Sequence, residues 1–472
     1  MATPTSLDLG SHLLGALPTP VIEALEHISD TADRQGNTAY LVGGIPRDLV
    51  MGRPLTADLD VVIVGDAVAV ARSVAQHYGG VVRVYGTFGT ATWNPELGAG
   101  ASVGPVDGCP AIDLITARSE SYAAPATLPI VQPGSLADDL ARRDFVANTL
   151  ALDMSAARFG QLLDSLGALA DIESRQLRAL HRASFIDDPT RILRAARYAI
   201  RLDFVIETDT MRWIEAGVPF LAQVTGKRIL NELERLFDEE NPIAALALLE
   251  DWGALEAIFP ALGAQGEIEA QLAALDTPPA EWRLGGWAAA GSERNKRDRM
   301  LLWLASQEVA VANSDDFAAE ISARLHLAGR DAERLANVLR LAVLPGPLDQ
   351  RHSSNSVLYR ATEKTVPRAL IDPGLAYLAW HLTTKASATA IRQENLAHFG
   401  RKLAHRRPLV KGDDLIALGL PAGPTYRRVL EVVHDAVLDG AVATREEALA
   451  LAESLVAQET AIRSDRSDGT LG

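Results

Sequence analysis

The spacing of apolar and polar residues changes along this chain, from a mixture of strand and helix patterns to helix patterns alone. In the first third, apolar residues with a helical period predict helices at residues 19–36 and 66–78. Short apolar and β-branched runs predict strands at residues 39–42, 60–64, 81–85, 88–93 and 111–115. From about residue 138 amphipathic helical segments dominate, with no convincing strand pattern after residue 180. The chain is therefore predicted to be α+β, with an N-terminal sheet and a helical remainder.

Breaks in these patterns predict several domains, as expected for a chain of 472 residues, which is too long for one compact core. Changes in the sequence pattern predict domain boundaries near residues 155, 265 and 405. The polar segment 461–472 predicts a disordered tail. Two loops are also predicted, a Gly-rich hairpin loop at 97–108 and a Pro- and Ala-rich loop at 123–137.

The cysteine and histidine content limits the chemistry available to the chain. A single cysteine, Cys109, excludes an internal disulfide and a multi-cysteine metal site, and it fits a reducing compartment. The ten histidines show no zinc-ligand spacing. The N-terminus has no basic segment followed by an apolar stretch, and no run of 18 apolar residues occurs. We expect a cytoplasmic protein that has no membrane partner.

The formal net charge of −16 argues against a nucleic-acid partner unless basic residues gather on one face. Phosphate contact requires only a local stripe of positive charge, and three basic clusters make such a stripe possible. Solvated helix faces would give the same clusters, so both interpretations stay open. The clusters are formed by Arg294, Lys296, Arg297 and Arg299; by Arg401, Lys402, Arg406 and Arg407; and by Arg427 and Arg428.

Paired carboxylates stand at the start of the strand predicted at residues 60–64. Asp58 and Asp60 are two residues apart, and the strand period of two places both on one face. Carboxylates of this kind can hold the metal ions of a phosphoryl-transfer site, and oxygen-only ligands suit Mg²⁺. Asp113, at the start of another predicted strand, can join them. Taken alone, the Asp58 and Asp60 pair is better explained as a solvated strand end, and Asp113 alone is weak evidence.

Gly43 and Gly44 follow a predicted strand and precede a helical segment. Without side chains, their amides can approach a triphosphate closely, and Arg47 can pair with a phosphate. A tight turn with no ligand is the alternative for the same residues.

Two further segments combine arginines with short polar side chains. In LARRDFVANTLALDM, residues 140–154, Arg143, Asp144 and Asn148 can bind phosphate and ribose, although a helix start with solvated arginines is the favoured explanation for the segment taken alone. In FIDDPTRILRAARYAIRLDF, residues 185–204, an arginine row at helical spacing indicates either a charged face or an anionic partner. We expect this row and the basic cluster at 401–411 to share one concave side.

Four segments taken in order resemble the class II tRNA nucleotidyltransferase and bacterial poly(A) polymerase family, within the polymerase β superfamily. LVGGIPRDLVMGRPLTADLD resembles the head motif LVGGxVRDxLLGRxxxDxD, and RRDFVANTLA resembles RRDFTINAMA. GQLLDSLGALADIESRQLRAL resembles the linker motif, and DDPTRILRAARY resembles EDPxRxLRAxRF. The chain departs from the family at Pro46, at Asp187 in place of Glu, at Ala168 in place of Gly, and in the longer insert at 97–108.

The resemblance implies both a fold and a role for each motif residue. It implies a polymerase-β-like head with a small mixed β-sheet (1–155), then an all-α neck (156–265), body (266–404) and tail (405–460). Asp58 and Asp60 match the ligands of catalytic Mg²⁺, with Asp113 as a third catalytic carboxylate. The residues matching nucleotide-binding positions are Gly43, Gly44, Arg47 and Asp48 for triphosphate; Arg143, Asp144 and Asn148 for ribose; and Asp188, Arg191 and Arg194. In the family, the positions of Asp188 and Arg191 form the amino-acid template that reads the base.

The function implied is addition of CCA, or part of it, to the 3′ end of tRNA from CTP and ATP without a nucleic-acid template. Poly(A) polymerase and the CC-only and A-only enzymes share all of these motifs. Outside the class, the alternatives are a non-catalytic RNA-binding relative and a nucleotidyltransferase of small molecules. The intact carboxylates speak against the first, and the long helical region speaks against the second. The sequence leaves the oligomeric state open.

Overall fold

The computed structural model describes residues 7–55, 58–85, 89–95, 109–265, 268–276, 292–307, 310, 313–343, 346–366, 373–383, 389–404, 406–420 and 424–468. The chain forms two compact units. Unit 1 comprises Met1–Val224 and Glu239–Ile258, and unit 2 comprises Thr225–Asp238 and Phe259–Gly472. The four-part division into head, neck, body and tail stays a prediction.

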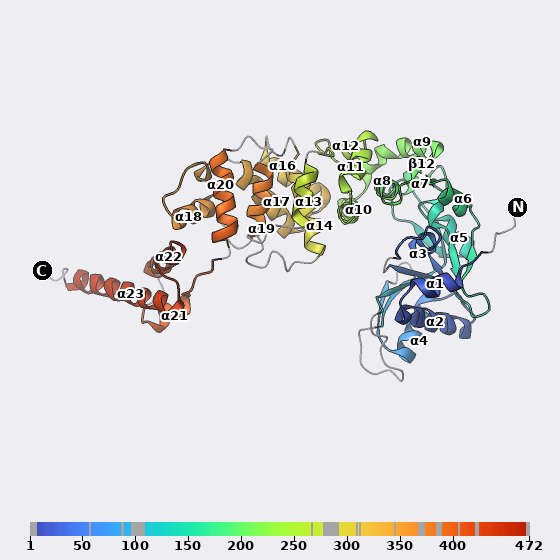
Figure 1. Ribbon diagram of the computed structural model, residues 1–472, viewed down its shortest axis with the longest axis horizontal. Coiled ribbons are helices and arrows are strands. Elements are labelled where there is room, and N and C mark those ends of the chain that lie inside the picture. Colours follow the sequence, from blue (N-terminus) through green and yellow to red (C-terminus); the bar gives the residue numbers. More distant parts are fainter. Residues whose placement is uncertain are drawn as a thin grey trace. The chain divides into compact units, whose positions relative to one another are not determined.

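Unit 1 is built on an eight-stranded mixed sheet, shown in blue and teal in Figure 1. The central strands β3 and β6 run parallel, and all other neighbours are antiparallel. The strand order is β1 (Leu7–Asp8), β10 (Gln161–Leu163), β9 (Ala151–Asp153), β2 (Thr38–Val42), β3 (Leu59–Val64), β6 (Ile112–Thr116), β5 (Thr90–Asn94) and β4 (Val81–Tyr85). The mixed sheet and the five strands predicted in the first third are confirmed, with small shifts at their ends.

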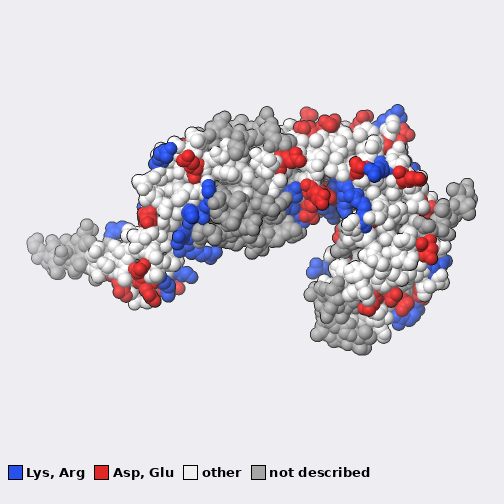
Figure 2. Space-filling model, in the orientation of Figure 1, with Lys and Arg blue, Asp and Glu red and all other residues white. Residues whose placement is uncertain are grey.

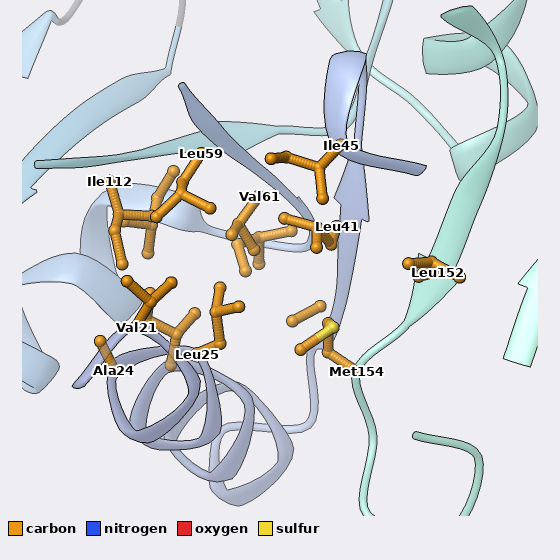
Figure 3. Close-up of a cluster of buried hydrophobic side chains, with 14 of the residues drawn as sticks. Val21, Ala24, Leu25, Leu41, Ile45, Leu59, Val61, Ile112, Leu152 and Met154 are labelled. Atoms are coloured by element: carbon orange, nitrogen blue, oxygen red, sulfur yellow. The ribbon is translucent and has the colours of Figure 1, made fainter. Parts of the chain in front are cut away.

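Two helices, α2 (Thr19–Arg34) and α4 (Ala67–Tyr78), cover one face of this sheet. Figure 3 shows Val21 and Leu25 of α2 pointing at Leu41 and Val61 of the strands. The other face is also covered, because Val62 packs with a separate cluster that includes Leu140 and Ala151. Burial on both faces explains why β3 is a continuous apolar run and not an alternating one.

The remaining helices of unit 1 lie between the strands of the sheet or after them in sequence. α8 packs against α11, and its N-terminal end carries the DDPTR segment. The helices are α1 (Gly10–Ala16), α3 (Gly44–Val50), α5 (Leu136–Ala141), α6 (Ala168–Glu173), α7 (Ser184–Asp187), α8 (Thr190–Leu202), α9 (Thr208–Gly217), α11 (Pro242–Asp251) and α12 (Ala254–Ile258).

Unit 2 is helical throughout its described residues, which confirms the α+β class with a helical C-terminal part. Its first helix, α10 (Gly226–Phe237), packs against α14 (Ser292–Ala305), where Phe237 meets Trp303. None of the described helices has both the length and the hydropathy needed to cross a bilayer. The other helices are α13 (Glu269–Asp276), α16 (Ser314–Leu325), α17 (Gly329–Val343), α18 (Asn355–Thr365), α19 (Pro373–Thr383), α20 (Ala390–His398), α21 (Gly412–Ala417), α22 (Pro424–Leu438) and α23 (Arg445–Asp468).

Three expectations about local structure are wrong in part. The loop predicted at 123–137 contains strand β8 (Ile130–Pro133), which pairs with β7 (Arg118–Ser121) as an exposed hairpin. The absence of strands after residue 180 is contradicted by the two-residue strand β12 (Val205–Ile206), paired with β11 (Gln176–Leu177). Helix α1 was not predicted. These elements are short or solvent-facing, so no hydrophobic period marks them. The Gly-rich segment 97–108 lies outside the described residues.

Candidate active site

The predicted metal-binding carboxylates lie on adjacent parallel strands. Asp60 on β3 is directly opposite Asp113 on β6 in the strand register. Both are half-buried, whereas Asp58, just before β3, is exposed. Leu59 between them is buried, so the alternation that the sequence predicts for this segment is present. The hydroxyl of Thr92 on β5 donates to Asp113 Oδ1 at 2.5 Å, which orients that carboxylate.

Burial dominates the electrostatics of Asp60. Burial raises the pKa of Asp60, and the nearby charges of Asp113 and Asp58 raise it further, while Arg143 opposes them. Among the described residues, no three His, Cys, Asp or Glu side chains converge as a ready-made metal site. The donors are nevertheless all carboxylate oxygens at a corner with an excess of negative charge, and this chemistry fits a divalent cation. Asp58 and Asp60 are the residues that would hold it.

Gly43 lies against this corner and ends strand β2 with a left-handed backbone, at φ 79°. A Cβ on Gly43 would lie 3.1 Å from Asp60 Oδ2 and 3.5 Å from Arg143 Nη1. A side chain would therefore crowd Asp60 and touch Arg143, and the positive φ of Gly43 adds strain for any residue except glycine. Gly44 begins α3 immediately after it. The structure thus brings Gly43, Asp60 and Arg143 together; their contact with a triphosphate stays a prediction.

A chain of hydrogen bonds connects five of the predicted nucleotide-binding residues. Arg47, which is only 2% exposed, donates from Nε to Asp48 Oδ1 at 2.8 Å and from Nη1 to Asn148 Oδ1 at 2.5 Å. Asn148 in turn donates to Asp144 Oδ1 at 2.9 Å. Arg194 Nε donates to Asp144 Oδ2 at 2.8 Å. Segments that are about 150 residues apart in the chain, by their numbering, are joined in this way.

This chain of contacts is internal to the protein. Burial alone would raise the pKa of Asp144, but Arg194 and the Asn148 amide hold it well below its usual range. The Tyr198 ring lies among the guanidinium groups, 5.5 Å from Arg47 and 4.8 Å from Arg197. Binding of phosphate by Arg47 would require it to leave Asp48 and Asn148. The predicted ligand contacts of Arg47, Asp48, Asp144, Asn148 and Arg194 therefore stay predictions.

The two residues of the predicted base-reading pair have different surroundings. Asp188 Oδ1 accepts from the Thr190 amide at 3.0 Å and from its hydroxyl at 2.6 Å, which stabilises the start of α8. Arg191 donates to Ser184 Oγ at 3.2 Å and to the Arg142 carbonyl at 2.7 Å. Arg191 also lines a cavity of about 390 Å³, whose walls include Asp187 but not Asp188.

Several residues that the sequence analysis did not single out lie beside these groups. The cavity is also lined by Glu120, Tyr122, Arg142 and His181, and no motif marks these positions apart from Arg142 in RRDF. Asp139 is fully buried and contacts both Arg142 and Arg143. In the sequence, Asp139 stands three residues before Arg142 and four before Arg143, and this spacing was the signal that could have indicated the contacts.

The basic residues are partly neutralised within each unit. Arg197 and Arg201 of α8 both pair with Glu239, and Arg194 pairs with Asp144. Figure 2 shows Lys and Arg gathered in patches on this face of the molecule. Lys402, Arg406 and Arg407 are exposed. Because the α8 arginines belong to unit 1 and residues 401–411 to unit 2, a shared concave side stays a prediction.

Known proteins resemble this chain over most of its length. Residues 39–178 match the model of the poly A polymerase head domain, and residues 203–265 match that of the probable RNA and SrmB-binding site of polymerase A. The CC-adding tRNA nucleotidyltransferase of Deinococcus radiodurans is 34% identical over 68% of this chain and 84% of its own length. This chain belongs to the tRNA nucleotidyltransferase and poly(A) polymerase family.

Two further members of the family match along nearly the whole chain. The A-adding tRNA nucleotidyltransferase of Geobacter sulfurreducens is 30% identical over 94% of this chain, which spans 48% of that relative's length. The structure of a CCA-adding enzyme in apo form II superposes with a TM-score of 0.67 at 24% identity, covering 96% of this chain and 99% of the other. At this identity the superposition shows a common fold. The names of these relatives differ in the nucleotides added: CC for the first, A for the second and CCA for the third.

Proposed function

We propose that the protein adds CCA, or part of it, to the 3′ end of tRNA from CTP and ATP, without a nucleic-acid template. The observation that carries this proposal is the pairing of Asp60 with Asp113 beside Gly43 and Arg143. Such a site suits a nucleoside triphosphate. Its carboxylates can hold a metal ion, and its arginine and open backbone can hold the negative triphosphate close to these carboxylates. A cytoplasmic location, where tRNA is processed, belongs to the same proposal.

In this reaction the RNA 3′ hydroxyl attacks the α-phosphorus, and the bond to pyrophosphate breaks. Mg²⁺ held by Asp58 and Asp60 would favour the ionised hydroxyl and the departing pyrophosphate. Arg143 lies where it can contact a phosphate oxygen, and its buried Nε has no hydrogen-bond partner among the described residues. The internal chain from Asp48 to Arg194 holds the head segment and α8 in register behind these groups.

Base selection is assigned to Arg191 with a carboxylate beside it. An aspartate accepts from the exocyclic amine of C or A and an arginine donates to the adjacent ring nitrogen, whereas uracil presents the opposite pattern. The sequence motif favours Asp188 as that carboxylate. Asp187 is the alternative, because it lines the same cavity as Arg191, while Asp188 Oδ1 is engaged by Thr190.

The decisive experiment incubates the purified protein with Mg²⁺, one labelled nucleotide at a time, and tRNAs ending before C74, before C75 and before A76. Addition to all three substrates identifies CCA addition, and addition to a subset identifies the CC-only or A-only activity. No incorporation on any of the three, under conditions where a known family member is active, would contradict the proposal.

Poly(A) polymerase is the second candidate, and the match to the poly A polymerase head domain favours it. The two activities differ in where they stop. The same preparation is given ATP and either a tRNA ending in CC or an unstructured RNA oligonucleotide. A single A on the tRNA supports tRNA 3′-end addition, and long A tracts on both RNAs support poly(A) synthesis.

A further inference from the structure

Asp139 is a buried carboxylate to which neither the motifs nor the matched relatives give a role. It lies on α5, its side chain is 0% exposed, and it accepts from two successive arginines. Arg142 donates to Oδ1 from Nε at 2.9 Å and from Nη2 at 2.6 Å. Arg143 donates to Oδ2 from Nη2 at 3.0 Å. One buried carboxylate therefore binds both arginines of the RRDF segment.

The two arginines depend on Asp139 to different degrees. Arg142 has a second carboxylate, because its Nη1 donates to Glu120 Oε1 at 3.1 Å on strand β7. For Arg143, Asp139 is the ion-pair partner found among the described residues. Loss of the Asp139 charge would leave Arg142 held by Glu120 but would leave Arg143 without an anchor.

The other end of the Arg143 guanidinium faces the catalytic corner. Its Nη1 and Asp60 Oδ2 converge on the point where a Gly43 side chain would begin. Its Nε is buried without a hydrogen-bond partner in the described part of the chain. An arginine released at this place would move to Asp60, because the carboxylates of Asp60, Asp113 and Asp58 offer negative charge at short range in partly buried surroundings.

We propose that Asp139 is a positioning residue: it holds Arg143 beside Gly43 and keeps it from closing an ion pair with Asp60. Asp60 thereby keeps its oxygens available for a divalent cation, and Arg143 keeps a donor available for the nucleotide. The identity of these ligands rests on the proposed function. The assignment of Asp139 itself rests on the contacts described above.

The test measures binding of Mn²⁺ alone, from the signal of free Mn²⁺ in electron paramagnetic resonance, without RNA or nucleotide. Asp139→Asn is expected to weaken Mn²⁺ binding by about tenfold, as for other residues that support metal ligands. The double variant Asp139→Asn with Arg143→Gln is expected to recover the wild-type affinity, because the competing cation is gone. The matched control is Asp138→Asn, an exposed neighbour on the same helix whose carboxylate bonds to Ser135. It should bind Mn²⁺ as the wild type does.

Kinetics provide a second readout that a purely structural role would not move. In Asp139→Asn the half-saturating Mg²⁺ for nucleotide incorporation should rise by about the same factor, and high Mg²⁺ should restore much of kcat. A loss of kcat at every Mg²⁺ concentration with unchanged metal affinity would overturn the inference. So would a double variant that fails to regain Mn²⁺ binding.

If Asp139→Asn does not fold, Arg143→Gln alone decides the question, because it leaves the buried carboxylate in place. It should bind Mn²⁺ at least as tightly as the wild type while its KM for nucleotide rises. Weaker Mn²⁺ binding by Arg143→Gln would refute the competition between Arg143 and the cation. Because Mn²⁺ titration needs no substrate, a wild-type protein that binds Mn²⁺ but incorporates no nucleotide would contradict the proposed function and not this inference.

Discussion

Half-buried Arg194 and buried Asp144 form an ion pair in which Nε lies 2.8 Å from Oδ2, although 50 residues separate them in the chain. Asp144 also accepts from Asn148, which in turn accepts from Arg47. The pair therefore joins helix α8 to the segment between α5 and β9, and through Asn148 to helix α3. Family motifs that look like separate ligand-binding elements in the sequence are parts of one internal network.

Removal of Arg194 should destabilise unit 1 strongly. Arg194→Ala leaves the Asp144 carboxylate buried without its cation, which costs about 3–5 kcal/mol of unfolding free energy. Arg201→Ala is the control, since Arg201 is about as exposed as Arg194 but lies 3.7 Å from Glu239, a carboxylate less buried than Asp144, and it should cost less than about 1 kcal/mol. Urea unfolding followed by circular dichroism measures both variants. Equal, small losses would show that the pair contributes little.

The same pair predicts a dependence on acid. The folded pKa of Asp144 is held below its unfolded value, which is about 3.9. Its contribution to the unfolding free energy is therefore fully present above that unfolded value and is lost as the pH falls further. The difference in stability between the wild type and Asp144→Asn should shrink as the pH falls below about 4. A difference that is constant across this range would contradict the lowered pKa.

Loss of either proposed metal ligand should abolish catalysis without unfolding the protein. Asp58→Ala and Asp60→Ala should each reduce incorporation in Mg²⁺ to a small fraction of the wild type. Both side chains lie outside the hydrophobic core, and removing one of several like charges relieves repulsion. Single-turnover incorporation and thermal unfolding are measured on the same preparations. Substantial turnover by either variant would exclude its role as a metal ligand.

Base choice separates the two candidate carboxylates beside Arg191. If Asp188 reads the base, Asp188→Ala should lower the preference for C and A over U and G by about tenfold or more, from a loss of 1–3 kcal/mol. If it only stabilises the start of α8, the variant loses about 1 kcal/mol of stability and keeps the nucleotide ratio unchanged. Asp187→Ala is measured in parallel with all four nucleotides. A shift in ratio for Asp187→Ala alone transfers the role to Asp187.

A histidine in unit 2 predicts a pH-dependent stability. Burial lowers the pKa of His381 to about 4, and its ring makes edge-on contacts with the rings of Tyr377 and Trp380. Because the folded pKa lies below the unfolded value of about 6.5, stability is complete above that value and falls as the pH drops toward 4. The full loss is about 3 kcal/mol. His381→Phe should remove this dependence in urea unfolding at a series of pH values, and an unchanged dependence would exclude His381 as its source.

The sequence by itself determined the α+β class, the five strands of the first third and the family. Hydrophobic period and β-branched runs specify local structure directly, as at residues 60–64, and ordered motifs such as LVGGIPRDLVMGRPLTADLD identify relatives. It also placed Asp58 and Asp60 together at the start of one strand. These features depend on neighbours in the chain, so one sequence is enough to find them.

Only the tertiary structure decided which of these residues meet. The placement of Asp60 opposite Asp113 follows from the parallel register of β3 and β6, which no local pattern encodes. The burial of Arg47 and the anchoring of Arg143 by Asp139 depend on which charges end up in partly dry surroundings, where each must find a partner. Charged residues have no hydrophobic period that marks them as buried. The sequence analysis therefore assigned them to a ligand, whereas in the fold they bind one another.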